Sequence, residues 1–171
     1  PAPITPDQIP RAGDLLAYWP FDEGTGAQTA DQSGNNHDIA SIGGATWTDG
    51  KFGKALSYDN GSTALPVAAH PPASGTEFSI SFWSWGNPAK LLGKNSTVME
   101  SIGGGRIINI HFPWSNSNVY WDVGNGGTDR INRNPGAAYL WGNWTHWVFI
   151  HNRSTGVMKW YINGVLDHSG T

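Results

Sequence analysis

The stretch FSISFWSW at residues 78–85 determines the fold class of this chain. Its apolar and polar residues alternate with a period of two, which places successive side chains on opposite faces of a β-strand. The two phenylalanines and the isoleucine share the face that we expect to pack inside the protein. Trp83 and Trp85 share the other face with two serines, so both rings are predicted to point away from the core.

Similar strand patterns recur on both sides of this stretch, and turn residues separate them. The chain holds 23 glycines and 11 prolines, and no helical period persists over three turns. Asn60 and Gly61 form the strongest type of short hairpin signal. Short strands divided by turns are typical of a sandwich or barrel, so an all-β protein is predicted. Further strands are expected at residues 15–21, 106–112, 118–123, 144–152 and 157–164.

The composition excludes several classes of function. The 171 residues suit about one domain. Only 13% are charged and the net charge is −3, which argues against nucleic-acid binding, because that requires clustered Lys and Arg. The absence of cysteine excludes disulfides, thiol catalysis and cysteine zinc sites. No stretch approaches the roughly 18 apolar residues that a membrane-spanning helix needs.

Four segments resemble a known family, and they follow one another in the order that this family shows. Together they resemble the concanavalin A-like lectin/glucanase superfamily, and in particular its laminin G-like jelly-roll modules, over about residues 14–168. The resemblance implies a two-sheet antiparallel β-sandwich (jelly roll) with one concave and one convex sheet, in an extracellular or cell-surface protein. The segments are LLAYWPFDEGTGAQTADQSGNNHD (15–38), DGKFGKALSYDNG (49–61), FSISFWSW (78–85) and WTHWVFIHNRSTGVMKWYINGVL (144–166).

Both ends of the chain carry expectations about domain organisation. Residues 1–13 are rich in proline and are predicted to be a linker or leader, so residues 14–171 form the laminin G-like domain. The end YINGVLDHSGT has the pattern of a strand, a tight turn and the start of a second strand. The resemblance also implies a closing C-terminal strand that carries an Asp. We therefore expect residues beyond 171 to complete the sandwich, on this chain or as a separate C-terminal fragment.

The acidic residues do not have the arrangement of a glycosidase, which needs two carboxyl groups across a cleft. Glucanases of the superfamily that this chain resembles carry two Glu and an Asp alternating on one strand. The only glutamates here are Glu23, Glu77 and Glu100, and none lies in such a pattern. No Gly-x-Ser-x-Gly nucleophile motif is present. We therefore expect a non-catalytic module, with an atypical hydrolase as the less favoured alternative.

Aromatic side chains beside polar ones indicate where a ligand binds. Sugar rings stack on planar aromatics through their C–H bonds, while polar groups bind the hydroxyls. The alternative is that a partner domain covers the aromatic residues. The polar half of such a site is expected among His111, Arg106, Asp122, Asn125, Asp129, Arg130 and Arg133. The predicted ligand-binding residues are Trp83, Trp85, His111, Trp114, Tyr120, Trp121 and Arg130.

The acidic, glycine-rich turn at residues 22–38 is a candidate calcium site, because calcium prefers six to eight oxygen ligands. Modules that this turn resembles often hold one structural calcium ion, with a further Asp from the last strand. The predicted ligands are Asp22 and the loop at Asn35 and Asn36. The alternative is a set of Asx-turns that close the loops without an ion.

The sequence favours a carbohydrate-binding, lectin-like module of a secreted or surface multidomain protein. A polysaccharide or glycan is the expected partner, with no nucleic acid and no membrane span. A structural or protein-interaction domain is the alternative, in which the aromatic face docks onto a neighbouring domain.

Overall fold

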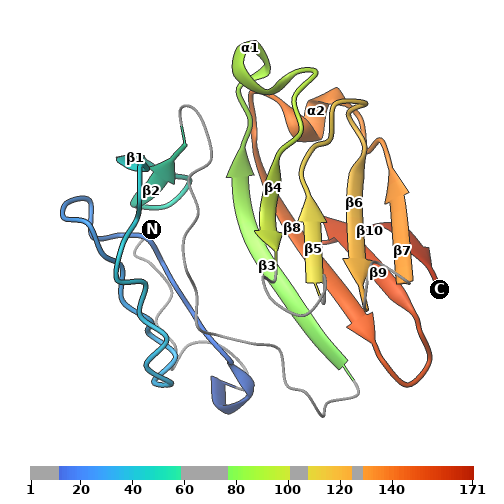
Figure 1. Ribbon diagram of the computed structural model, residues 1–171, viewed down its shortest axis with the longest axis horizontal. Coiled ribbons are helices and arrows are strands. Elements are labelled where there is room, and N and C mark those ends of the chain that lie inside the picture. Colours follow the sequence, from blue (N-terminus) through green and yellow to red (C-terminus); the bar gives the residue numbers. More distant parts are fainter. Residues whose placement is uncertain (1–11, 59–76, 101–107, 125–128) are drawn as a thin grey trace. The chain divides into compact units, whose positions relative to one another are not determined.

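The computed structural model describes residues 12–58, 77–100, 108–124 and 129–171 (Figure 1). The chain divides into two compact units, Pro1–Ala73 and Ser74–Thr171. In the described residues no helix is long and apolar enough to cross a membrane. The domain limit predicted at residue 14 stays a prediction.

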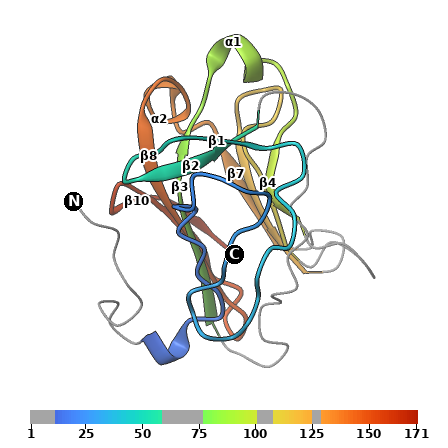
Figure 2. The ribbon, with the colours of Figure 1, turned by 90° about the vertical axis from the view of Figure 1, so that its left-hand side faces the viewer.

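The first unit consists mainly of loops, which are visible in Figure 2. After the 3₁₀ helix η2 (Ala12–Asp14), its regular structure is the antiparallel pair β1 (Thr46–Asp49) and β2 (Lys54–Ser57), together with an isolated bridge between Thr29 and Ile39. The hairpin predicted at Asn60 lies outside the described residues.

The strand predicted at residues 15–21 is wrong, because this segment is irregular. This segment forms hydrogen bonds with a loop rather than with another strand. The N–H of Tyr18 donates to Oδ1 of Asp31 at 2.8 Å, and the indole N–H of Trp19 donates to the carbonyl of His37 at 2.8 Å. The apolar run therefore anchors a turn.

The second unit contains two four-stranded antiparallel sheets. We name them by a central strand: the β8 sheet has the order β10-β9-β8-β3, and the β6 sheet has the order β4-β5-β6-β7. The elements are β3 (Glu77–Trp85), α1 (Pro88–Leu91), β4 (Thr97–Glu100), β5 (Ile108–His111), β6 (Val119–Val123), β7 (Asp129–Arg133), α2 (Ala137–Leu140), β8 (Trp144–Asn152), β9 (Met158–Ile162) and β10 (Val165–Gly170).

The two sheets pack face to face around one aromatic core, which confirms the predicted two-sheet β-sandwich. Trp121 of the β6 sheet packs against Phe149 of the β8 sheet, with ring centroids 5.7 Å apart. Trp147 and Trp160 are also completely buried in this core. Burial of several large aromatic side chains supplies the main favourable free energy of such a domain.

The strands predicted in the second unit are confirmed where the structure describes them, while residues 106 and 107 of the strand predicted at 106–112 lie outside the described residues. The turn before β10 shows how the last strand forms. Asn163 and Gly164 both have positive φ angles, 50° and 83°, as a two-residue hairpin turn of the I′ type requires. The chain thus returns along β9 as β10, with the expected pattern of strand, tight turn and strand. The closing strand expected beyond residue 171 stays a prediction.

Candidate functional site

Trp83 and Trp85 lie on the outer face of the β8 sheet, as predicted. They are 39% and 48% exposed, whereas Phe78, Ile80 and Phe82 pack against the core on the opposite face. The strand has no bulge between these residues, because each pairs in regular register with β8. The period of two in the sequence therefore gave the correct orientation.

Four of the other predicted ligand-binding residues come together on the outer face of the β6 sheet. They line a hollow with a volume of about 290 Å³, and they are His111, Trp114, Tyr120 and Arg130. This face is on the other side of the sandwich from the two exposed tryptophans. The predicted ligand-binding residues are therefore divided between two faces, because alternation assigns a residue to a face of its strand but not to one of the two sheets.

The placement of Trp121 in the ligand site is also wrong. Its ring is completely buried between the sheets and packs edge-on against Phe78, with centroids 5.9 Å apart. Its indole N–H donates to the carbonyl of Ile150 at 3.3 Å. Trp121 follows Tyr120 directly on β6, so the two side chains point to opposite faces, and only Tyr120 faces the hollow.

The aromatic part of the hollow is formed by three rings in contact. His111 lies directly opposite Tyr120 in the register of β5 and β6, with ring centroids 6.0 Å apart. Trp114 packs against His111 at 4.2 Å, and a turn holds it there, because the N–H of Ser117 donates to its carbonyl at 2.8 Å. The amide of Asn116 donates to the Tyr120 hydroxyl at 2.9 Å. The rings are therefore positioned by backbone and side-chain contacts before any ligand binds.

The charged part of the hollow is an ion pair between a buried carboxylate and a partly exposed guanidinium. Asp122 is completely buried and accepts two hydrogen bonds from Arg130, from Nε at 2.6 Å and from Nη2 at 2.7 Å. The hydrogen bond to Asp122 raises the pKa of Arg130, although burial alone would lower it. The guanidinium also lies 5.2 Å from the centroid of the Tyr120 ring. Arg130 is thus fixed in one orientation by a carboxylate and an aromatic ring.

Asn109 is a candidate site residue that the sequence analysis missed. Its amide N–H donates to Nε2 of His111 at 3.1 Å, so Nε2 acts as an acceptor in this arrangement and Nδ1 carries the proton near the Thr97 hydroxyl, also at 3.1 Å. The side chain is completely buried, and its amide oxygen Oδ1 has no hydrogen-bond partner among the residues that the structure describes. Asn109 precedes His111 by two residues, so alternation was the available signal for its place on this face.

The remaining polar candidates are dispersed. Asp129 lies 3.3 Å from the buried ring of His151, and Arg133 donates to the carbonyl of Asp167 at 3.0 Å. Arg106 and Asn125 lie outside the described residues. Of the members of this group that the structure describes, Asp122, His111 and Arg130 therefore belong to the candidate site.

In the first unit two of the predicted calcium ligands, Asp22 and Asn35, have separate protein partners. Oδ1 of Asp22 accepts the N–H of Lys54 at 2.7 Å and lies directly against Gly53, where a Cβ would collide with it. The Asn35 amide donates to the carbonyl of Leu15 at 2.8 Å, and Asn36 takes a positive φ of 60°.

The acidic turn is instead organised around Asp31. Burial by itself would raise the pKa of Asp31, but hydrogen bonds from Tyr18, Ser33 and His37 lower it to about 2. Among the residues that the structure describes, no three His, Asp or Glu side chains form a group that suits a metal ion. Calcium binding here stays a prediction.

Comparison with known proteins identifies the family. A profile described as concanavalin A-like lectin/glucanases superfamily, of the laminin G type, matches residues 59–171. No curated protein matches the chain significantly. The matched range contains every strand of both sheets of the sandwich and all residues of the candidate site. The chain therefore belongs to the concanavalin A-like lectin/glucanase superfamily.

Proposed function

We propose that this protein is a non-catalytic carbohydrate-binding module that holds a sugar in the hollow on the outer face of the β6 sheet. The observation that carries the proposal is the convergence of aromatic rings and a fixed guanidinium around a volume of about 290 Å³. The lining residues come from β5, β6, β7 and the turn after β5, so the strand register holds the site together.

The chemistry of the hollow matches what a sugar ring presents. Trp114 and Tyr120 offer ring faces or edges to C–H groups, and Arg130 offers N–H donors to hydroxyls. Because Asp122 already neutralises Arg130, the pair adds no net charge, and a neutral sugar is the ligand that it favours. The fixed rings reduce the entropy lost on binding.

The burial and hydrogen bonds of Asp122 support a binding role over a catalytic one. A glycosidase needs one carboxyl group to donate a proton and another to act as nucleophile or base. Asp122 is instead completely buried and already accepts two hydrogen bonds from Arg130, so neither of its oxygens is directed toward a substrate. We further propose a secreted or cell-surface location, as the low charge content and the family both favour.

Isothermal titration against a panel of neutral oligosaccharides tests the proposal. In a complex so identified, Trp114→Ala is expected to weaken binding at least about tenfold, or 1.4 kcal/mol. Trp83→Ala is the matched control, because it removes an exposed tryptophan from the opposite face and is expected to leave the affinity unchanged. Failure of every glycan to bind, or equal losses in the two variants, would contradict the proposal.

The alternative function is protein interaction through the exposed Trp83 and Trp85 rings. Large exposed aromatics are enriched where proteins associate. Hydrogen exchange at residues 83–85 distinguishes this function, since docking of a neighbouring domain would protect these amides, whereas sugar binding in the β6 hollow would not.

A further inference from the structure

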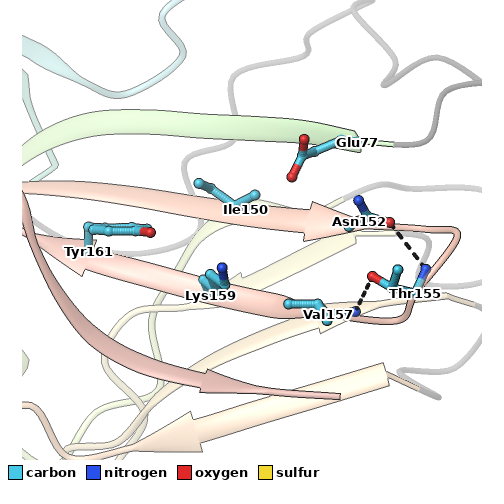
Figure 3. Close-up of a pocket in the computed structure, with 7 residues that line it drawn as sticks. All are labelled: Glu77, Ile150, Asn152, Thr155, Val157, Lys159 and Tyr161. Atoms are coloured by element: carbon cyan, nitrogen blue, oxygen red, sulfur yellow. Dashed lines mark hydrogen bonds between the residues drawn. The ribbon is translucent and has the colours of Figure 1, made fainter.

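A second hollow, with a volume of about 380 Å³, lies on the outer face of the β8 sheet. Figure 3 shows Tyr161 at one end of it and Asn152 at the other, with Ile150 and Lys159 between them. It lies toward the start of β3, whereas Trp83 and Trp85 lie at the end of that strand. Its volume is within the usual range for sites that bind small molecules, about 300–1,000 Å³.

Two opposite charges face each other across this hollow without forming an ion pair. Glu77 on β3 lies opposite Asn152 on β8, and Lys159 on β9 lies opposite Ile150 on β8. The whole of strand β8 thus separates the two charged residues, so their backbones are about 10 Å apart. In the described parts of the chain neither has an ion-pair partner, so each retains its hydrogen-bonding capacity for a ligand.

The rim beside Asn152 is rigid. The side-chain oxygen Oδ1 of Asn152 accepts three hydrogen bonds. They come from the N–H of Ser154 at 3.1 Å, from the Ser154 hydroxyl at 2.8 Å and from the N–H of Thr155 at 3.1 Å. The Thr155 hydroxyl in turn accepts the N–H of Val157 at 3.3 Å. These bonds use the oxygen of the Asn152 amide and leave its NH₂ group as a fixed donor at the edge of the hollow (Figure 3).

We propose that this hollow is a second carbohydrate subsite that accepts one neutral sugar ring. Ile150, Val157 and the Tyr161 ring supply the apolar contact surface. Glu77 accepts hydrogen bonds from sugar hydroxyls, while Lys159 and the Asn152 amide donate them. The inference relies on the proposed function for the class of ligand, but not for the place where it binds.

The two opposite charges cancel, so the hollow gives an ionised sugar no net electrostatic advantage. Lys159 attracts the carboxylate of a uronic acid but Glu77 repels it, and the ammonium of an amino sugar meets the reverse, whereas a neutral ring can bind both groups through its hydroxyls. Two subsites on opposite faces also allow one domain to bridge two glycan chains. Such bivalent attachment strengthens binding to a polysaccharide without new contacts.

An NMR titration of the full chain tests the second subsite separately from the first. The probes are the methyl glycosides of glucose, galactose, mannose, glucuronic acid and glucosamine. At least one neutral glycoside is expected to shift the amide signals of residues 150–161, and the two charged glycosides are expected to bind these residues no more tightly than the neutral one. The same shifts must persist in Trp114→Ala, which removes the first site.

Two isosteric charge variants make the selectivity falsifiable. Glu77→Gln leaves a net positive hollow and is expected to improve binding of the glucuronide relative to the glucoside. Lys159→Met leaves a net negative hollow and is expected to favour the glucosaminide in the same way. The inference is overturned if no neutral glycoside shifts residues 150–161, or if neither variant changes the ranking. Shifts confined to residues 108–123 would retain the proposed function and overturn the second subsite alone.

Discussion

On the outer face of the β6 sheet the charged groups are paired and held in place, whereas on the outer face of the β8 sheet they stand apart. Asp122 is completely buried against Arg130, but Glu77 and Lys159 have no ion-pair partner among the described residues. A buried pair loses much if one member is removed, since the other is left charged in a poorly solvated position. The same sandwich thus has one face on which the charged groups hold each other in place and one on which they stand apart.

The largest difference between the faces is expected from Arg130→Met. This variant leaves the Asp122 carboxylate buried without its two donors, so the free energy of unfolding should fall by about 3–5 kcal/mol. Lys159→Met on the other face should change it by less than about 0.5 kcal/mol. Urea denaturation monitored by tryptophan fluorescence measures both. The Asp122→Asn, Arg130→Met double variant should recover part of the loss, and equal effects of the two single variants would show that the faces do not differ.

A strand could be predicted from the sequence where one of its faces is buried in the core and the other is less buried. In β8 the inward residues include Trp147 and Phe149 and the outward ones include His146 and Val148, so the alternation is clear from residue 144 to 152. β7 (DRINR) was missed because Ile131 is its one apolar residue, and it lies at the edge of the β6 sheet. An edge strand has one neighbouring strand, and its sequence therefore carries less of the signal.

The candidate site was predicted in its residue types but not in its assembly. His111, Tyr120 and Arg130 were predicted to bind a ligand, and the register of β5, β6 and β7 brings them together. That register depends on pairing between distant strands, which no local pattern reports. Trp121 was misassigned because an aromatic residue suits a sugar platform and a core equally well, and only tertiary packing decides between them.

The acidic turn of the first unit provides a further test of whether polar groups are arranged for the fold or for a ligand. If calcium binds there, chelation by EDTA should lower the melting temperature by about 5–10 °C. This shift corresponds to the roughly 2.7 kcal/mol by which calcium stabilises the folded state when its concentration is 100 times Kd. Asp22→Asn is the informative variant, because it retains an oxygen for the N–H of Lys54 but loses the charge that calcium prefers. Identical melting curves with calcium and with EDTA would leave Asp22, Asn35 and Asn36 with a purely structural role.

A smaller effect on stability is expected from Asn109→Ala. The variant removes the donor to Nε2 of His111, so the free energy of unfolding should fall by about 1–2 kcal/mol. Asn132→Ala is the control, since Asn132 lies on the same face but its hydrogen bond with Asn118 is exposed to water. Titration with a glycan that binds the β6 hollow should show a loss of affinity for the first variant and not for the second. Equal affinities would place Asn109 outside the binding machinery.

The smallest effect concerns pH and should arise on the β8 sheet. Burial lowers the pKa of His146, whose Nε2 lies 2.8 Å from the Ser81 hydroxyl. Burial also lowers the pKa of His168, where Arg133 acts in the same direction and Asp167 in the opposite one. The unfolded chain therefore takes up protons at a higher pH than the folded one, so the stability that is present above about pH 6.5 is lost as the pH falls through the lowered folded pKa values.

The free energy of unfolding, measured by urea denaturation from pH 8 to pH 5, should decrease toward acid, and less so in His146→Gln. A further reduction is expected when His168→Gln is added, because each histidine contributes to the proton uptake. If the doubly substituted protein keeps the full pH dependence of the original chain, neither histidine is responsible for it, and groups outside the β8 sheet must be titrated instead.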